Sequence, residues 1–286
     1  MGNLISNDRL NRKNQFFYIN STEIAGIQSI SINSDSQAIP VKYLGMDKTV
    51  LAPNAAQIGN ININALFISN DPFLQYTGNL GFDGYIFQSR NVAATNNYSF
   101  TSGYLTSYSS RGTIGQIPEV NMTINSFGNV GEIASSDSVD ITNNFAAIPT
   151  SIPSNILKIP GPGSININID DFTTNRVLNY DLTINCQRNP IYILGQRSPY
   201  KIELVYPQEI ICNFKIDVND YSFDNVKKFP GTNRIKSLTL SVLDYNTNNT
   251  ITSYSFDNMN LISETYNTNV DGNVTLDLQY KTYLSR

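Results

Sequence analysis

Apolar and polar residues alternate along much of this chain, with the period of two that is typical of β-strands. In segment 57–68 isoleucines stand between asparagines, and segment 164–170 reads S-I-N-I-N-I-D. Segment 27–32 repeats the pattern, with Ile30 and Ile32 expected to face the core. Because successive side chains of a strand point to opposite faces, each segment has one apolar face and one face of amides and hydroxyls.

The same pattern, bounded by turn residues, predicts most of the remaining elements. Asp71 followed by Pro72 indicates the start of a short helix that Gly78 would end. A second short helix is expected at the matching place in the second half of the chain, over 221–229. Further strands are expected at 16–20, 85–88, 98–108, 120–127, 177–186, 201–218 with a break at Pro207, 235–243, 250–256, 261–266 and 274–283.

Short blocks of sequence recur in the same order in the two halves of the chain. These blocks predict a tandem duplication of a β-rich domain, and easy self-similarity of an Asn-, Ile- and Ser-rich chain is the alternative. The matches, with their offsets, are P-V-K-Y-L-G (40–45) with P-I-Y-I-L-G (190–195) at 150, G-N-I-N-I-N-A (59–65) with C-N-F-K-I-D-V (212–218) at 153, N-Y-S-F (97–100) with S-Y-S-F (253–256) at 156, and Val120, Met122 and Ile124 with Leu276, Leu278 and Tyr280 at 156.

We therefore expect an all-β protein of two tandem, similar domains. Each would be a β-sandwich or open barrel of mostly antiparallel strands with one short helix. Four prolines and two glycines between residues 146 and 163 predict a stiff linker. The expected organisation is a flexible N-terminal arm (1–15), a first domain (16–145), the linker (146–163) and a second domain (164–286).

Composition narrows the class of function. The chain has 286 residues, a formal net charge of −4, and neither His nor Trp. No stripe of basic residues occurs, which argues against sequence-independent binding of nucleic acid. No apolar run is long enough to span a bilayer, so we expect no membrane partner, and the N-terminus has no apolar signal region. The start M-G-N-L-I-S fits a loose myristoylation pattern and, more simply, an ordinary polar arm.

No enzyme activity, metal site or cofactor is expected. Without His, the Ser-His and Cys-His nucleophile systems and imidazole metal sites are excluded, and glycine motifs for phosphate binding are missing. Cys186 and Cys212 are expected to be buried free thiols, with a single disulfide as the alternative. Carboxylate pairs that could serve a glycosidase or bind calcium are expected to be surface groups, namely Asp170 with Asp171, Glu119 with Glu132, Asp137 with Asp140, and Asp217 with Asp220.

Segment 17–33, F-Y-I-N-S-T-E-I-A-G-I-Q-S-I-S-I-N, followed by the P-V-K-Y-L-G block, resembles the N-terminal region of phage tail tube proteins. In that family a strand with a Gly-φ-Gln-Ser-φ core precedes a Pro/Phe-rich turn and a φ-Leu-Gly element. The resemblance is direct over about residues 16–68 and reaches the second half only through the duplication. The matching positions are Gly26, Ile27, Gln28, Ser29, Ile30, Pro40, Leu44 and Gly45, of which the second half keeps Pro190, Leu194 and Gly195 and lacks the Gly-φ-Gln-Ser part.

The resemblance implies a structural role. Tail tube proteins have a β-sandwich with a flanking helix, form hexameric rings, and stack into a tube through which DNA passes during ejection. A chain with two copies of the domain would form a trimeric ring with pseudo-sixfold symmetry. Its partners would be other copies of itself, other tail proteins and, transiently, DNA in the lumen. The protein would be assembled in the host cytoplasm and reside in the virion tail.

Two other classes of function remain open. The first is another virion structural protein, such as a duplicated jelly-roll capsid, tail-tip or fibre subunit, which would also fit a duplicated, Asn-rich β-protein. The second is a carbohydrate-binding β-sandwich, and the absence of Trp argues against it because sugar sites favour large aromatic faces. State of assembly separates these classes, since only a tube subunit forms rings that stack.

Overall fold

The structure is a computed structural model, and its strands account for most of the residues that it describes. The described residues are 15–20, 22–35, 38–42, 50–53, 58–67, 71, 73–90, 94–95, 97–133, 160, 164–170, 172–196, 198–218, 235–268 and 273–286. The predicted N-terminal arm, apart from residue 15, nearly all of the predicted linker, and the predicted helix at 221–229 lie outside these residues.

The elements follow one another in a similar order in the two halves of the chain. Those of the first half are β1 (Gln15–Ile19), β2 (Thr22–Glu23), β3 (Ile27–Asp35), β4 (Ala38–Val41), β5 (Val50–Pro53), β6 (Ile58–Leu66), the 3₁₀ turn η2 (Leu74–Thr77), β7 (Phe82–Arg90), β8 (Ala94–Thr95), β9 (Asn97–Thr113), β10 (Glu119–Ser126) and β11 (Val130–Ile133). Those of the second half are β12 (Ile165–Ile169), β13 (Phe172–Thr174), β14 (Val177–Asn185), β15 (Arg188–Ile191), β16 (Lys201–Leu204), β17 (Gln208–Asp217), β18 (Ile235–Leu243), β19 (Thr250–Asn267) and β20 (Thr275–Leu284).

Antiparallel pairing joins most of these strands into one large sheet, and the prediction of an all-β fold is confirmed. The main path of the sheet runs β13-β12-β18-β19-β20-β17-β14-β9-β10-β6-β3. β9 and β19 are the long members, with 17 and 18 residues. Each pairs with one set of strands in its first half and with another in its second half, so each passes from one layer of the fold to the other.

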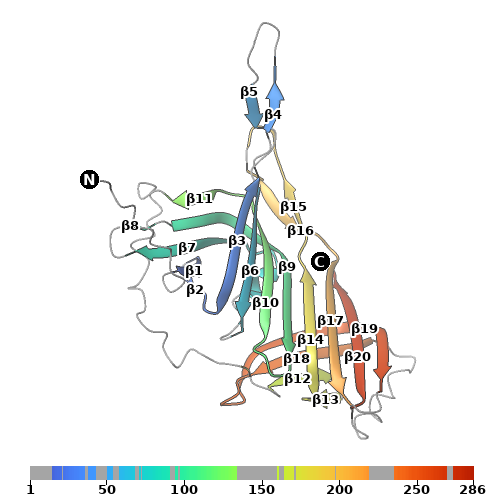
Figure 1. The fold of residues 1–286 in the computed structure, drawn as a ribbon. Helices are drawn as coiled ribbons and strands as arrows, with labels where there is room; N and C mark the ends of the chain where they lie inside the picture. Colours follow the sequence, from blue (N-terminus) through green and yellow to red (C-terminus); the bar gives the residue numbers. More distant parts are fainter. Residues whose placement is uncertain are drawn as a thin grey trace.

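Two layers result. The front layer consists of β3, β6, β10, the second half of β9, β14, β17, β20 and the second half of β19, and Figure 1 shows most of these strands side by side from β3 to β20. The back layer contains β1, β7 and β11 in the first half and β12 and β18 in the second. In Figure 1, β7 and β11 cross the direction of β3 and β6 steeply.

The apolar side chains between the layers form one cluster that includes residues of both halves. In β17 every second residue, from Gln208 to Ile216, is buried, and the residues between them are only partly buried. The same period of two appears in β6, β10, β14 and β20. The front layer therefore turns one face to the core and the other, rich in Asn, Ser and Thr, to water.

Residues related by the predicted offsets have equivalent ladder partners and backbone conformations in the two halves. This agreement supports the predicted duplication, which stays a prediction. Leu105 lies opposite Ile124 as Leu261 lies opposite Tyr280, at the predicted offset of 156. Left-handed backbone recurs at the same offsets, since φ is positive at Asn20 and Asp170, which are 150 apart, and at Ser102 and Asn258, which are 156 apart.

Some details of the sequence interpretation change. The predicted helix at 71–78 is a single 3₁₀ turn, η2, although the carboxylate of Asp71 does accept a hydrogen bond from the N–H of Phe73 at 2.8 Å. Ile32 and Leu182 are 150 positions apart, and their partners across the ladder, Ile61 in β6 and Cys212 in β17, are 151 apart. The offset between β6 and β17 is therefore 151 rather than the predicted 153. The strands predicted at 250–256 and 261–266 are parts of one strand, β19.

Candidate assembly interface

β9 and β14 join the two halves of the chain edge to edge. Residues 107–113 of β9 pair antiparallel with residues 179–185 of β14. One end is extended by a further backbone bond, because the N–H of Cys186 donates to the carbonyl of Thr106 at 2.9 Å. We call this pairing the internal joint. It makes the front layer continuous from the first half of the chain to the second.

Two strand edges at the ends of the front layer have no partner strand among the described residues. β3 closes the layer on one side and pairs only with β6. On the other side, residues 261–265 of β19 pair with β20 along one edge, and no described strand lies along the other. Such an edge presents backbone N–H and C=O groups that can bind another strand. We call these two the β3 edge and the β19 edge.

Burial differs between β3 and its counterpart β14. Tyr180 and Leu182 of β14 are 2% and 0% exposed. Ile30 and Ile32, 150 positions earlier in β3, are only partly buried against the core. β14 has β17 on one side and β9 on the other, whereas β3 has only β6. The apolar face of β3 therefore lacks the cover that the internal joint gives to β14.

β9 and β19 carry a bulge at the same place. The pairing register of β9 with β10 shifts at Thr106, and that of β19 with β20 shifts at Ile262, 156 positions later. A bulge bends its strand and turns a backbone group out of the ladder. In the internal joint, the carbonyl of Thr106 accepts the bond from Cys186. The β19 edge therefore has the same irregularity as the edge of β9 that β14 occupies.

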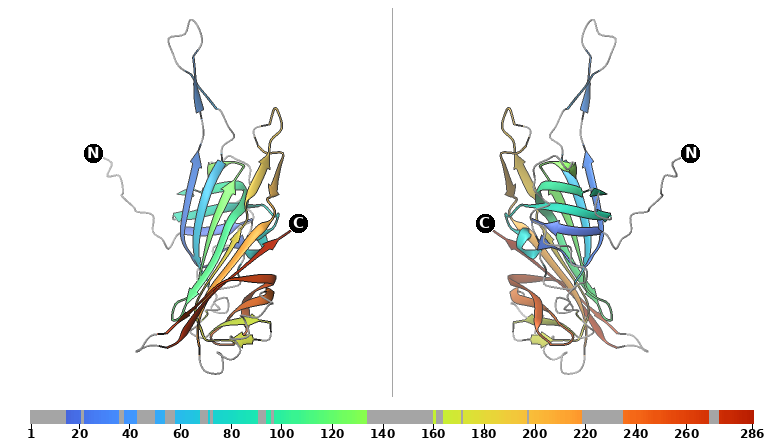
Figure 2. Two further views of the ribbon diagram at one scale, coloured as in Figure 1. Left: turned by 90° about the vertical axis from the view of Figure 1, so that its right-hand side faces the viewer. Right: turned by 90° about the vertical axis from the view of Figure 1, so that its left-hand side faces the viewer.

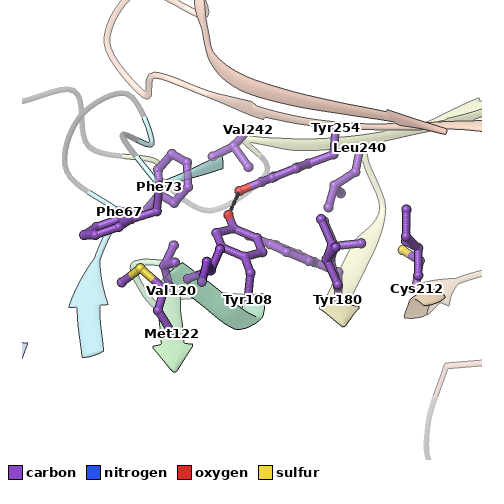
Figure 3. Close-up of a cluster of buried hydrophobic side chains, with 14 of the residues drawn as sticks. Phe67, Phe73, Tyr108, Val120, Met122, Tyr180, Cys212, Leu240, Val242 and Tyr254 are labelled. Atoms are coloured by element: carbon purple, nitrogen blue, oxygen red, sulfur yellow. Dashed lines mark hydrogen bonds between the residues drawn. The ribbon is translucent and has the colours of Figure 1, made fainter. Parts of the chain in front are cut away.

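A buried polar cluster connects the halves beside the internal joint, and Figure 3 shows its two tyrosines, Tyr108 and Tyr254. The hydroxyls of Tyr108 and Tyr254 are 2.6 Å apart, and Tyr108 donates a short hydrogen bond to the carboxylate of Asp71. Tyr254 also donates to that carboxylate at 3.3 Å, and the N–H of Asp71 donates to the hydroxyl of Thr252 at 3.4 Å. Asp71 and Tyr108 belong to the first half, and the other two to the second, so the cluster fixes one half against the other.

Burial changes the acidity of this cluster. Desolvation raises the pKa of the Asp71 carboxyl, although its bonds to Tyr108, to the N–H of Phe73 and to Tyr254 act in the opposite direction. Desolvation, together with the Asp71 charge, also raises the pKa of Tyr108 and of Tyr254. Both hydroxyls are therefore protonated at neutral pH and available as donors.

Arg188 holds the internal joint just beyond the bond between Cys186 and Thr106. Its Nε donates to the carbonyl of Leu105 at 2.8 Å, and one terminal nitrogen donates to the carbonyl of Gly78 at 2.7 Å. Burial lowers the pKa of this guanidinium. Since a buried charge without hydrogen bonds is costly, these bonds from the second half to first-half carbonyls hold the joint in one arrangement.

The water-facing side of the front layer is covered by hydrogen-bonded amides. Asn64 donates to Asn121 at 2.6 Å across β6 and β10, and Asn60 donates to Asn125 at 3.4 Å. Thr123 joins the same network through Asn62 at 3.0 Å. Cations on this face lie beside carboxylates, in the pairs Arg111 with Glu119, Lys215 with Asp277, and Lys281 with Glu209. The face is therefore hydrophilic, and its positive charge is neutralised locally.

Two hairpins project from one end of the molecule (Figure 2). They are β4–β5 and β15–β16, and each forms a two-stranded sheet of its own. The β15–β16 hairpin ends in a turn where the N–H of Gln196 donates to the carbonyl of Ile193 at 3.2 Å. Leu194 in this turn is 106% exposed, and Gly195 has a φ of +91°. An apolar tip of this kind is typical of a contact surface.

The residues singled out by the resemblance lie in two places. Gly26 (φ +87°) forms the turn before β3, where its carbonyl accepts hydrogen bonds from Leu66 N–H at 2.8 Å and from the Gln28 side chain at 3.1 Å. Pro40 and Pro190 lie in the strands β4 and β15 of the two hairpins. Leu194 and Gly195 form the tip described above, and Leu44 and Gly45 lie outside the described residues.

The sequence patterns do not predict the open edges or the Asp71 cluster as sites. They contain part of the signal for the cluster, since they indicate Asp71 as a capping residue. The signal for the edges was the weaker apolar pattern of 27–32 compared with 177–186, where Tyr180, Leu182 and Ile184 alternate. Recognising either site required knowing which strands are neighbours.

Among the described residues, the side chains that could carry out chemistry do not lie close together. Within the described ranges, no three Cys, Asp or Glu side chains lie close enough to hold a metal ion. Asp170 pairs with Lys236 at 2.8 Å, and Glu119 pairs with Arg111 at 3.5 Å. Cys186 and Cys212 are free and buried, and desolvation raises the pKa of their thiols to about 11 and about 12. Thiols with such pKa values are inert at neutral pH.

Of the helical residues described, none form a helix that could cross a membrane. Comparison of the sequence with protein-family models and with curated proteins finds no match.

Proposed function

We propose that this protein is a structural subunit of a viral tail tube. Three chains form a closed ring in which each chain fills two similar places, and rings stack around a channel that conducts DNA. The protein then resides in the virion tail, where other tail proteins meet the ends of the tube. The resemblance of residues 17–45 to phage tail tube proteins and the arrangement of the strand edges both support this proposal.

The observation that carries the proposal is that β14, in the second half, has a neighbouring strand on both edges, whereas its counterpart β3 has one on a single edge. The second half receives a strand from the first at the internal joint, and the first half leaves the corresponding edge open. The second half in turn leaves the β19 edge open. Two different edges that fit each other make a head-to-tail contact, and such contacts close into rings when the rotation between subunits allows it.

The water-facing side of the front layer suits the wall of a channel for DNA. Amide networks such as Asn64–Asn121 offer neutral polar groups, and the lysines and arginine there are paired with carboxylates. Unpaired cations would bind phosphates, because neutralising phosphate charge is the main source of non-specific affinity for DNA. A face whose described cations are all paired with carboxylates lets DNA pass without binding its phosphates.

The projecting hairpins supply a contact between stacked rings. Both hairpins extend beyond the same end of the front layer (Figure 2). Their exposed apolar residues include Ile39 and Val41 in β4, and Leu194 at the tip of the other hairpin. In a stack, these residues would be buried against the next ring, which stabilises the contact at about 25 cal/mol per Å² of apolar surface removed from water.

Negative-stain electron microscopy of the purified protein at rising concentration tests the proposal. We expect rings with a central hole, and stacks of such rings at high concentration. Mass photometry of the smallest ring should give three chains. Solid particles without a hole at every concentration, also after addition of preformed tube fragments as seeds, would contradict the proposal. Closed shells would favour a capsid subunit, and monomers that bind a glycan array would favour a carbohydrate-binding protein.

A further inference from the structure

The internal joint is a template for a joint between chains. Its two strands are β9 of the first half and β14 of the second. The counterpart of the second half of β9 lies 156 positions later in β19, as the shared bulge at Thr106 and Ile262 shows. The counterpart of β14 lies 150 positions earlier in β3. These counterparts are the β19 edge and the β3 edge.

We propose that the β3 edge of one chain pairs antiparallel with the β19 edge of a second copy, in the register copied from the internal joint. This inference rests on the proposed function and deepens it by naming the residues of the contact. In the internal joint, Asn185, Ile184 and Thr183 lie opposite Ser107, Tyr108 and Ser109. The joint between chains therefore places Asp35 opposite Ser263, Ser34 opposite Glu264, and Asn33 opposite Thr265.

The edges cannot meet within one chain. Along the front layer they are separated by β6, β10, β9, β14, β17 and β20. Seven strand spacings of about 4.8 Å place β3 roughly 34 Å from the second half of β19. Since neither edge has another described partner, the occupant of each is the complementary edge of a second copy. The pairing covers Ile30 and Ile32 as the internal joint covers Tyr180 and Leu182.

A side-chain contact across this joint follows from the same offsets. Tyr254 and Tyr108, whose hydroxyls meet beside the internal joint, correspond to Tyr98 and Glu264. Glu264 lies opposite the buried Leu278, as Tyr108 lies opposite the buried Met122, so it belongs to the core-facing side of its strand. It is nevertheless exposed, because no described strand covers that end of the layer.

Tyr98 is the natural partner for this carboxylate. It lies in the back layer near the start of β9 and is 37% exposed, whereas its counterpart Tyr254 is 2% exposed. In the ring, the Tyr98 hydroxyl of one chain donates to the Glu264 carboxylate of the next. This bond takes the place that the contact between the Tyr108 and Tyr254 hydroxyls has beside the internal joint. It is the stronger of the two, because its acceptor is a charged carboxylate.

Disulfide cross-linking tests the register. Asn33 and Thr265 both lie on the water-facing side, so the double variant Asn33→Cys/Thr265→Cys leaves the core unchanged. The control Ser29→Cys/Thr265→Cys carries the same number of thiols, but it is four residues out of register, which is about 13 Å along the strand. Disulfides require Cα atoms within about 7 Å. The native thiols are buried and contribute little background.

We expect oxidation of Asn33→Cys/Thr265→Cys to give covalent species up to three chains on a non-reducing gel, and the control to remain mostly single chains. Electron microscopy of both variants shows whether rings are present. Rings without cross-linking of the first pair, or with equal cross-linking of the control, would overturn the register and leave the proposed function standing. Absence of both rings and cross-links would overturn both.

A double-mutant cycle tests the contact between Tyr98 and Glu264. Tyr98→Phe and Glu264→Gln should each weaken a single joint between chains by about tenfold, which corresponds to about 1.4 kcal/mol, and should therefore raise the protein concentration needed for half-maximal ring formation. The double variant should behave like either single variant, because both remove the same bond. Multiplication of the two effects in the double variant, or no effect of either, would refute the contact.

Discussion

Leu182 and Ile32 occupy the same position in the two halves of the chain, and truncating each to alanine separates folding from assembly. Leu182 is 0% exposed in the single chain, and Ile32 is partly buried at the β3 edge. Both substitutions remove the same number of carbon atoms. Fully buried Leu-to-Ala changes cost about 2–5 kcal/mol of unfolding free energy, from lost burial plus the cavity.

The magnitudes follow from burial. For Leu182→Ala we expect the free energy of unfolding to fall by about 3–4 kcal/mol, because this side chain is fully buried in the single chain. For Ile32→Ala we expect about half of that in the isolated chain. In the ring, the proposed joint buries Ile32 fully, so the remaining half, about 1.5 kcal/mol, is lost at each joint. That amount weakens each joint by about tenfold, and three joints multiply the effect on closed rings.

Urea unfolding at low protein concentration, followed by circular dichroism, measures the first quantity. Light scattering and electron microscopy against concentration measure the second. Leu182→Ala should lower the urea midpoint more than Ile32→Ala does, at an unchanged slope. Ile32→Ala should impair ring formation more than its effect on stability accounts for. Equal losses of stability combined with normal assembly of Ile32→Ala would refute the reasoning that β3 is an edge waiting for a strand.

Two further predictions concern the buried carboxyl and the hairpin tip. Because desolvation raises the pKa of Asp71 in the folded protein, its contribution to stability is present below the pKa of an unfolded aspartate, near 4, and is lost as pH rises through the raised value. The urea midpoint of Asp71→Asn relative to wild type should therefore improve from pH 4 to pH 7, and a constant difference would contradict this assignment. Leu194→Ser, at a fully exposed position, should leave stability and single rings unchanged and shorten the stacks seen by electron microscopy, whereas stacks of normal length would exclude the tip from the stacking contact.

The strand content of this protein and much of its internal order follow from local sequence. Alternation in segments such as 57–68 and 164–170 predicts β6 and β12, because the period of two records which side chains face the core. The offset of 156 derived from Val120, Met122 and Ile124 agrees with the observed pairing of β9–β10 and β19–β20. Both features are set by the order and spacing of residues along the chain, so they can be predicted from the sequence alone.

The tertiary structure decided what depends on distant neighbours. β19 continues through Asn258, whose left-handed φ of +56° is tolerated within the long strand, where the sequence indicated an interruption. Asp71 is a buried acceptor for tyrosines that lie 37 and 183 positions away, and a local capping pattern cannot reveal them. The edges of β3 and β19 are open only because of the order of strands in the sheet. An edge is defined by the missing neighbour rather than by its own residues, so a weaker apolar pattern such as that of 27–32 does not identify it by itself.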